Sequence, residues 1–452
     1  METIDRLLVR LVDFAWGMPL IVLLVGGGLI LSILIRGLPL FKMGHAVALL
    51  RGQYDDERAP GEISHFQALS TALSSTIGMG NIGGVAIAIT QGGPGAVFWM
   101  WVAALVGMAT KFFTCTLAVL YRGEDSLGKL QGGPMYFIEH GLGRRWRALA
   151  IFFSICGMIG CLAMFQTNQM AEILFAAYTV PHWVTGAVAT VLVTTIILGG
   201  LPRIAKFATA VVPAMCVLYL VLVLIILAQH LTEIPALFGR IFHDAFTGTA
   251  AAGGAQGIAV REIIQTGVKR AAFSNEAGIG TAPMAHGAAR TREPVREGLV
   301  AMIGPFVDTI IVCTLTALTI LAMTDWRSGD VEGTSLTLQA FEASLGAGGK
   351  FGLILIVTLF GVSTMIGYSY YGKKCFSYLF GAGRARIYDV FYLGMLFLGA
   401  IWSLDVVINL LDSAFAFMAL PTMVATLILA PRVVRETRAY FKRMDAGTGR
   451  GR

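Results

Sequence analysis

Two segments of this chain place hydroxyl, amide and glycine residues where an apolar helix would be expected to continue. In the first, residues 68–84, serines and threonines replace the usual leucines, and Asn81 stands among four glycines, Gly78, Gly80, Gly83 and Gly84. Each glycine weakens a helix by about 0.5–1 kcal/mol relative to alanine. We therefore expect a helix break here. A broken helix exposes N–H groups that can bind a carboxylate and C=O groups that can bind a cation.

The second segment, residues 272–283, has the same character. It contains Asn275, Gly278 and Gly280, and Glu276 adds a charge that is costly at membrane depth. One such segment could simply allow two helices to pack closely, as small residues do in membrane proteins. Two segments, each with an amide and hydroxyl groups, indicate a pair of breaks that line a ligand site.

The elements that must position these segments are apolar helices. Of the 452 residues, 56% are hydrophobic and 13% are charged, against about 25% charged in an average soluble domain. So few charges argue against a disordered chain, a nucleic-acid-binding protein and an ordinary soluble enzyme. We predict an all-α integral membrane protein with 11 transmembrane helices. Nine are clear apolar runs near Leu20–Ile35, Pro94–Leu120, Ala148–Ala176, Trp183–Leu198, Ala205–Ala228, Leu299–Met323, Phe351–Tyr371, Tyr388–Trp402 and Leu410–Ala430. The two weaker spans, Phe66–Thr90 and Gly257–His286, contain the segments described above.

Basic residues divide unevenly between the loops that these spans create. One side holds 25 lysines and arginines and the other holds five, with four more in or beside spans. The positive-inside rule then places the N-terminus outside and the C-terminus in the cytoplasm of a multi-pass protein of the cell (inner or plasma) membrane. The first apolar run reads as an anchor rather than a removed signal peptide. No cysteine spacing suggests a metal site, and we expect no cofactor.

Each weak span begins a run of five spans, and the two runs start from opposite sides of the membrane. This predicts two inverted repeats, residues 66–232 and 253–432. An N-terminal helix with a cytoplasmic loop precedes them over residues 1–65, and a cytoplasmic tail follows over residues 433–452. Interrupted helices at corresponding positions of inverted halves are typical of the binding site of a secondary transporter.

Several motifs resemble those of the sodium:alanine (alanine/glycine:cation) symporter family. The longest is GGPGAVFWMWVAALVG at residues 92–107, and others are GPMY at 133–136, FSNEAG at 273–278, FVDT at 306–309 and STMIG at 363–367. The resemblance covers about residues 15–430. It implies a leucine-transporter-like 5+5 inverted repeat with one extra N-terminal helix. It also implies Na⁺-coupled uptake of alanine or glycine, with Na⁺ as the co-transported ion. We expect a monomer whose partners are the amino acid, Na⁺ and the lipid bilayer.

The resemblance places the substrate between the two breaks. The amides near Met79 and Gly80 would hold its carboxylate, and Gln166 resembles a family position that faces the substrate. The residues implied to contact substrate are Gly78, Met79, Gly80, Asn81, Gln166, Phe273, Asn275 and Gly278.

The resemblance also implies two Na⁺ sites. The first would involve Asn81, Asp308 and the carbonyl of Thr76. The second would lie between carbonyls of the first break and hydroxyls of a later span. The residues implied to bind Na⁺ are Ser74, Thr76, Ile77, Asn81, Asp308, Ser363 and Thr364.

Purely structural roles are alternatives for several of these residues. Gln166 could bond neighbouring helices, Phe273 could be ordinary packing, and the hydroxyls of residues 363 and 364 could bond their own helix. Asp308 could instead pair with one of three nearby basic residues, Lys111, Lys269 or Arg270.

The chain departs from the family pattern at several positions that bear on substrate size and ion number, including residues 160–163, Tyr368 and Lys373. Most members have threonine where this chain has Met79, and an acid where it has Thr114. The main rival hypothesis is a proton-coupled or otherwise divergent amino-acid transporter with a different substrate, in which Glu276 or Asp308 would carry protons. An ion channel would show uncoupled flux, and a membrane enzyme would need several acids or histidines that converge at one face.

Overall fold

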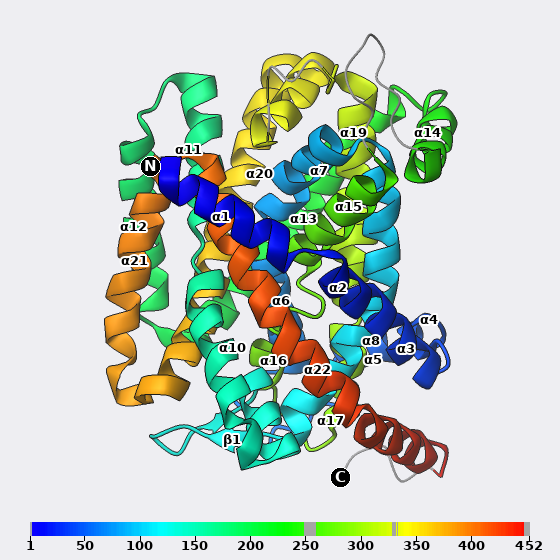
Figure 1. The fold of residues 1–452 in the computed structure, drawn as a ribbon, viewed down its shortest axis with the longest axis vertical. Coiled ribbons are helices and arrows are strands. Elements are labelled where there is room, and N and C mark those ends of the chain that lie inside the picture. Colours follow the sequence, from blue (N-terminus) through cyan, green and yellow to red (C-terminus); the bar gives the residue numbers. More distant parts are fainter. Residues whose placement is uncertain (1, 248–258, 328–330, 332, 447–452) are drawn as a thin grey trace.

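The computed structural model describes residues 2–247, 259–327, 331 and 333–446. The predicted start of the second repeat, residues 253–258, and residues 447–452 of the predicted tail lie outside the described residues. Within these ranges the chain is almost entirely helical, as predicted (Figure 1). The only sheet in the described part is an antiparallel hairpin of β1 (Gly123–Glu124) and β2 (Leu130–Gln131), in which Gly123 faces Gln131.

Six helical segments of the described residues are long and apolar enough to cross a membrane. They are α8 (Gly95–Leu120), α10 with α11 (Arg147–Gly160 and Met164–Tyr178), α13 (Gly200–Ala228), α17 to α19 (Pro294–Met323), α20 (Gly333–Phe380) and α22 (Leu404–Asp445). Two bent helix pairs raise the number to eight if each pair is one span. The multi-span helical architecture is therefore confirmed, and the number eleven stays a prediction.

One of the bent pairs lies near the N-terminus and the other is the first predicted break. The N-terminal pair bends by 44° between residues 9–15 and 18–34, and the second bends by 52° between residues 65–76 and 80–92. The helices of these two pairs are α1 (Glu2–Ala15), α2 (Met18–Ile21), η1 (Val22–Gly26), α3 (Gly27–Leu34), α6 (His65–Thr76), η2 (Gly80–Gly84) and α7 (Val85–Gly92).

The second predicted break separates α15 (Val260–Asn275) from α16 (Ala282–His286). The span that follows it is divided into α17 (Pro294–Ala301), α18 (Ile303–Pro305), a π-helical η5 (Phe306–Cys313) and α19 (Thr314–Met323). The remaining elements are α4 (Leu38–Phe41), α5 (Met43–Leu50), α9 (Pro134–Tyr136), η3 (Phe137–Gly141), η4 (Arg144–Trp146), α12 (His182–Ile197), α14 (Ile234–Thr247), η6 (Ala382–Arg384) and α21 (Ala385–Ile401).

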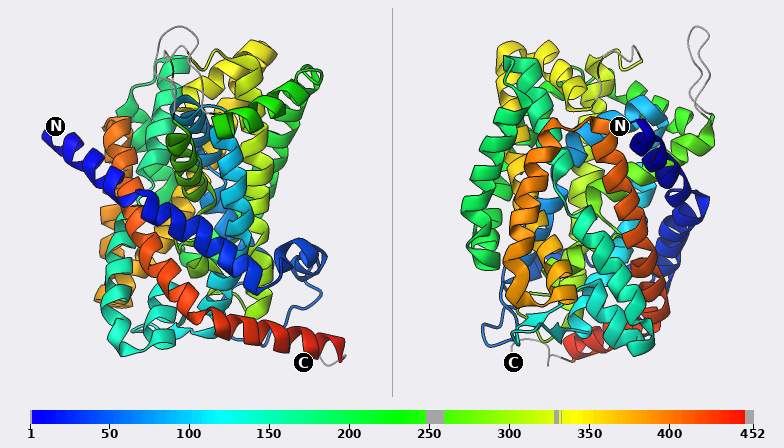
Figure 2. Two further views of the ribbon diagram at one scale, coloured as in Figure 1. Left: turned by 45° about the vertical axis from the view of Figure 1, so that its right-hand side comes forward. Right: turned by 60° about the vertical axis from the view of Figure 1, so that its left-hand side comes forward.

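The broken helices lie at the centre of the bundle. α6 packs against α13 and α20, and α15 packs against α8 and α7. Other helices surround this core: α12 and α21 lie side by side at one edge, while α1 crosses α22 on another face (Figures 1 and 2). The two breaks are thus shielded from lipid on several sides, which is the condition for tolerating irregular backbone at membrane depth.

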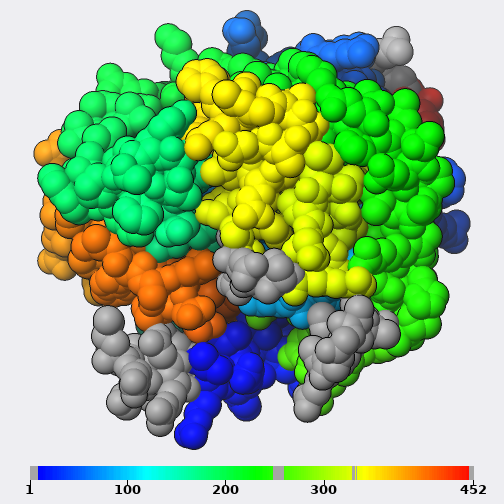
Figure 3. Space-filling model, turned by 90° about the horizontal axis from the view of Figure 1, so that it is seen from above, coloured from blue at the N-terminus to red at the C-terminus, as the bar shows by residue number. Residues whose placement is uncertain are grey.

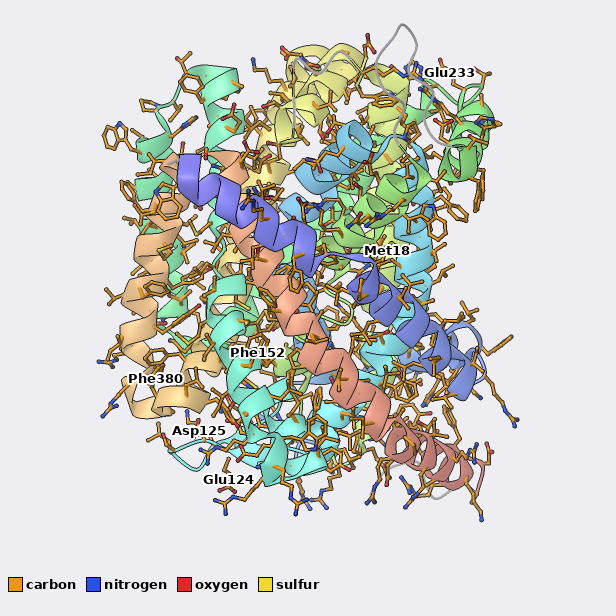
Figure 4. The ribbon with its side chains drawn as sticks, in the orientation of Figure 1. Met18, Glu124, Asp125, Phe152, Glu233 and Phe380 are labelled. Atoms are coloured by element: carbon orange, nitrogen blue, oxygen red, sulfur yellow. The ribbon has the colours of Figure 1, made fainter. Side chains whose placement is uncertain are left out.

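The molecule has two distinct ends. Glu124 and Asp125, in the hairpin region, lie at one end and Glu233 lies at the other (Figure 4). We call these the hairpin end and the α14 end. The α14 end is covered by the first part of α20, which turns sharply at Gly346 (φ 58°, ψ −142°) and lies over the middle of this face (Figure 3). The charge pattern predicts that the hairpin end faces the cytoplasm.

Candidate functional site

The first break begins where α6 ends. α6 starts with a capping box, in which Ser64 and Gln67 each accept a hydrogen bond from the other's backbone N–H at 3.2 and 2.9 Å. The helix stops at Ile77, whose backbone is extended (φ −76°, ψ 100°). Helical structure resumes only at Gly80, in a π-helical turn. Glycines and short hydroxyl side chains favour this break because they contribute little to helix stability.

Two glycines of the first break allow other helices to approach its backbone. A Cβ on Gly78 would overlap the Thr364 hydroxyl of α20. A Cβ on Gly80 would lie 3.1 Å from the Cα of Ser274 on α15. The first break therefore touches the second broken helix directly, and any side chain at these two positions would push the elements apart.

The second break is also built from unusual backbone. α15 ends at Asn275, and Glu276 then adopts a left-handed conformation (φ 56°) that is rare for a non-glycine residue. Gly278 (φ 86°) and Gly280 (φ 104°) follow. The Asn275 side chain accepts from the N–H of Ala277 at 2.9 Å, and the Thr281 hydroxyl donates to Glu276. Side chains of the break thus accept a hydrogen bond from a backbone N–H that the interrupted helix leaves free, and donate one to the buried Glu276 carboxylate.

Asp308 connects the two breaks. Its carboxylate accepts from the Asn81 side-chain amide of the first break at 2.7 Å and from the Ser274 hydroxyl of α15 at 2.9 Å. Thr309 donates to it at 2.7 Å. Asp308 is fully buried in the π-helical η5. The predicted neighbourhood of Asn81 and Asp308 is therefore present, and Ser274 and Thr309 join it.

Among the described residues, no basic side chain forms an ion pair with Asp308 within 4.0 Å. Lys269 and Arg270 contact Asp412 of α22 instead, and Lys269 is 3.7 Å from that carboxylate. Lys111 interacts electrostatically with both Asp308 and Glu276. Lys111 is thus a buried basic residue whose charge acts on both of these acids.

The residues of the second predicted Na⁺ site lie where α6 meets α20. The Gly78 N–H, which would bond the Ser74 carbonyl in a continuous helix, donates to the Asn81 side chain at 2.8 Å instead. On α20, Thr364 donates to its own helix at the Phe360 carbonyl (2.9 Å), as the structural alternative predicted. The Ser363 hydroxyl oxygen is buried and has no hydrogen-bond partner among the described residues. Such an oxygen is a candidate ligand for a bound ion.

The Met79 side chain and the backbone of Gln166 both adjoin Gly361 of α20. If Gly361 carried a Cβ, it would lie 3.4 Å from the Met79 methyl group and 3.8 Å from the backbone carbonyl oxygen of Gln166. Both side chains are buried, and the Gln166 Oε1 atom has no hydrogen-bond partner among the described residues. This oxygen therefore does not form the hydrogen bond to a neighbouring helix that the structural alternative for Gln166 requires.

Two further predicted substrate contacts, Phe273 and Gly278, face different parts of the molecule. The Phe273 ring packs edge-on against Phe165 at 5.1 Å between centroids and lies 5.5 Å from the Phe415 ring. Phe273 also adjoins Gly80, so it belongs to the cluster around the first break. Gly278 points elsewhere, because a Cβ on it would meet Leu24 and Met423. The structure thus places Met79, Asn81 and Phe273 around the first break, and it directs Gly278 away from that break.

Comparison with known proteins identifies the family. The family model described as "Sodium:alanine symporter family" matches residues 1–451. The chain belongs to the sodium:alanine symporter family. It is 43% identical over 441 residues to the sodium/alanine symporter AgcS of Methanococcus maripaludis, covering 95% of each chain. It is 33% identical over 439 residues to the probable sodium/glutamine symporter GlnT of Bacillus subtilis, covering 96% of this chain and 90% of the relative.

Solved structures show the same fold for this family member. MhsT in complex with L-phenylalanine gives a TM-score of 0.59 at 11% identity, covering 83% of this chain and 98% of that one. A Na⁺-coupled sialic acid symporter gives 0.55 at 11% identity, covering 92% and 98%. The leucine-transporter type of fold is confirmed. Family membership makes this chain a multi-pass membrane transporter of the cation-coupled amino-acid symporter class, and not an enzyme.

At its hairpin end, the symporter has a buried cluster that its sequence did not reveal. Glu297 of α17 accepts hydrogen bonds on its two oxygens, one from His65 at the start of α6 and the other from His286 at the end of α16, the latter at 2.6 Å. All three side chains are at most 1% exposed. We call these three residues the His–Glu–His junction. It joins the hairpin-end halves of both broken helices through one carboxylate.

Arg122 strengthens the same contact. Its guanidinium donates to the carbonyls of Gly287 (2.8 Å), Ala289, Thr291 (3.2 Å) and Pro60 (3.3 Å). Burial lowers the pKa of Arg122 to about 10, and the nearby Glu297 charge opposes this shift. The guanidinium therefore stays charged at neutral pH and holds the chain after α16 against the chain before α6.

Proposed function

We propose that this symporter couples the inward movement of Na⁺ to the uptake of a small neutral amino acid, alanine or glycine, by alternating access. The observation that supports this most is the contact of both helix breaks with the single buried carboxylate of Asp308 through Asn81 and Ser274. A cation bound to this carboxylate would therefore interact with both broken helices. The relatives named as sodium/alanine and sodium/glutamine symporters support the same class of ion and substrate.

In this proposal, the substrate carboxylate binds the backbone N–H groups near Met79 and Gly80, where the second half of the broken helix begins. The substrate ammonium group binds carbonyl oxygens and the side-chain oxygen of Gln166. Phe273 and Asn275 form the opposite wall, and Gly278 supports the break from behind. The unpartnered Gln166 oxygen favours this arrangement, because a buried acceptor without a donor is costly until a ligand supplies one.

Two Na⁺ ions complete the proposed site. The first binds Asn81, Asp308 and the Thr76 carbonyl. The second binds the carbonyls of Ser74 and Ile77 with the hydroxyls of Ser363 and Thr364, and the unpartnered Ser363 hydroxyl favours it. No further cofactor is part of the proposal. Because Na⁺ and substrate stabilise the same arrangement of the breaks, each raises the affinity for the other by the same factor.

The proposed transporter works as a monomer with eleven spans, with its N-terminus outside and its C-terminus in the cytoplasm. Its repeats are residues 66–232 and 253–432. The hairpin end then faces the cytoplasm, and the α14 end, covered by the first part of α20, faces outside. The uneven distribution of basic residues supports this orientation.

Uptake of labelled alanine into proteoliposomes tests the proposal. An inward Na⁺ gradient with a membrane potential should accumulate alanine, because 100 mV supplies about 2.3 kcal/mol per charge, enough for an accumulation of roughly tens-fold. Replacing Na⁺ with K⁺ on both sides should reduce uptake to equilibration. Equal uptake under the two conditions would contradict Na⁺ coupling, and accumulation driven by a pH gradient without Na⁺ would favour the proton-coupled rival.

Met79 should limit the size of the substrate. Met79→Ala removes the part of the side chain that faces Gly361, and one methylene in a pocket is worth roughly 1–3 kcal/mol of discrimination. We expect the ratio of kcat/KM for glutamine over glycine to rise by about tenfold or more, measured by competition in the uptake assay. Met215→Ala, which shortens a buried methionine of α13, is the matched control and should leave this ratio unchanged. The same ratio in both variants would remove Met79 from the pocket.

A further inference from the structure

A groove lies at the hairpin end, between the end of α3 and the last turns of α22. Its volume is about 540 Å³. It lies outside the substrate and ion site, and none of the proposed transport steps uses it. The residues that line it are Leu34, Ile35, Arg36, Leu38, Val434, Thr437, Arg438, Phe441, Lys442 and Asp445.

The polar lining of this groove is predominantly basic. Arg36, Arg438 and Lys442 are exposed there, against the one acid Asp445. Among the described residues, none of the three basic side chains has a carboxylate within 4.0 Å. Their N–H donors are therefore available to an anion that enters the groove.

The rest of the groove is apolar and continues onto apolar surface. Leu34 is 42% exposed at the end of α3, and Leu38, Val434 and Phe441 add further apolar wall. Beside the groove, Leu40 and Phe41 of α4 are 64% and 80% exposed. A small soluble anion would leave this apolar surface uncovered, whereas a molecule with an anionic head and a hydrocarbon chain would cover both parts.

The groove is held open by contacts on the other side of α22. The last part of this helix, drawn in red, runs along the end of the molecule rather than through it (Figure 2). Tyr440 and His45 form a 2.7 Å hydrogen bond, and Arg443 contacts Glu293 at 2.7 Å. These contacts fix the inner face of the helix and turn Arg438 and Lys442 toward the groove.

The surroundings of the groove add to its positive charge. Lys42 of the α4–α5 connection lies 4.8 Å from the ring of Phe441. Burial, with further contributions from Arg296 and Lys42, lowers the pKa of His45. His45 is therefore neutral at physiological pH, and the positive potential at this face comes from side chains whose charge does not depend on pH in that range.

We propose that this groove is a binding site for one anionic phospholipid, with the phosphate between Arg36, Arg438 and Lys442 and an acyl chain against the exposed apolar face of α3. Basic pockets between spans at the cytoplasmic membrane surface commonly bind such headgroups, and each basic side chain near the surface contributes about 1 kcal/mol. The proposal requires only that this end of the molecule lies at a membrane surface. It is therefore independent of the transported amino acid and of the coupling ion.

Native mass spectrometry of the full chain in neutral detergent tests this site. Titration with phosphatidylglycerol should give one bound lipid at concentrations where phosphatidylcholine does not bind. The triple variant Arg36→Gln/Arg438→Gln/Lys442→Gln should weaken phosphatidylglycerol binding by about tenfold or more. Arg144→Gln/Arg145→Gln/Arg384→Gln is the matched control, because it removes the same charge from exposed residues of the hairpin end outside the groove. It should leave the affinity unchanged.

The possible results separate the groove from simpler explanations. Equal loss of binding in both triple variants would show that only the overall charge attracts the lipid, and would overturn the site. Binding of phosphatidylcholine with equal affinity would also overturn it, as would full competition by inorganic phosphate at low concentration. If the triple groove variant fails to fold, Arg438→Gln alone should weaken binding severalfold, and unchanged affinity in that folded variant would equally overturn the proposal.

Discussion

Asp308→Asn should remove most of the Na⁺ response of uptake while the protein remains folded. The change keeps the shape of the side chain but removes the charge that both helix breaks contact through Asn81 and Ser274. Hydrogen bonds to a charged group are worth about 1.5–3 kcal/mol, which corresponds to a rise of roughly 10–100-fold in the Na⁺ concentration for half-maximal uptake. The measurement is alanine uptake as a function of Na⁺, with the Na⁺-dependent shift of the melting temperature as a second readout.

Asp389→Asn provides a matched control for this prediction. Asp389 of α21 is also buried, but it lies away from the breaks and forms an ion pair with Lys373 of α20 at 2.6 Å. Its substitution should lower stability without changing the Na⁺ dependence. If Asp308→Asn folds and responds to Na⁺ as the unchanged protein does, Asp308 is a structural residue that only connects the two breaks.

The positions of the breaks could be predicted from local sequence because the cause is local. Glycines and hydroxyl residues in an otherwise apolar span remove helix stability at one place, and the irregular backbone is found there, at Ile77–Met79 and at Glu276–Thr281. Ser274 and Thr309 were missed as partners of Asp308, although both stand inside motifs that the sequence showed. Which hydroxyl in a motif turns toward a carboxylate depends on how two helices are rotated against each other, and one sequence does not contain that information.

The His–Glu–His junction could not be predicted either, because it depends entirely on how helices that are distant in the sequence pack together. Its residues come from three helices, and His65 is separated by 232 positions from Glu297. Single histidines in apolar segments give no spacing pattern, so they read as scattered residues. Gly278 shows that a position within a motif does not fix the direction in which a residue faces. Its place in the motif suggested a pocket contact, but its left-handed backbone directs it toward Leu24 and Met423.

Glu297→Ala should have the largest effect on stability of any single change considered. Both histidines of the junction would lose the acceptor that they share, and breaking a buried charged contact by removing one partner costs about 3–5 kcal/mol. Glu297→Gln keeps two polar atoms in place and should be intermediate. The melting temperature of the purified protein should therefore fall in the order unchanged protein, Glu297→Gln, Glu297→Ala. Glu293→Ala, four residues earlier, removes an ion pair with Arg443 that is partly exposed and should cost less than about 1 kcal/mol.

The junction should also restrict the motion of the broken helices, which a melting temperature does not measure. Because Glu297 holds α6 to α16, the hairpin-end halves of the two broken helices should open together or not at all. In Glu297→Ala, hydrogen exchange should rise in residues 60–66 and 284–291 in parallel, while the α14-end halves of the same spans keep their protection. Arg122, which holds the adjoining carbonyls, should limit the increase, so that Arg122→Gln in the same background raises exchange further in both segments. Exchange that rises in only one of the two segments would mean that the halves move independently and that the shared carboxylate does not couple them.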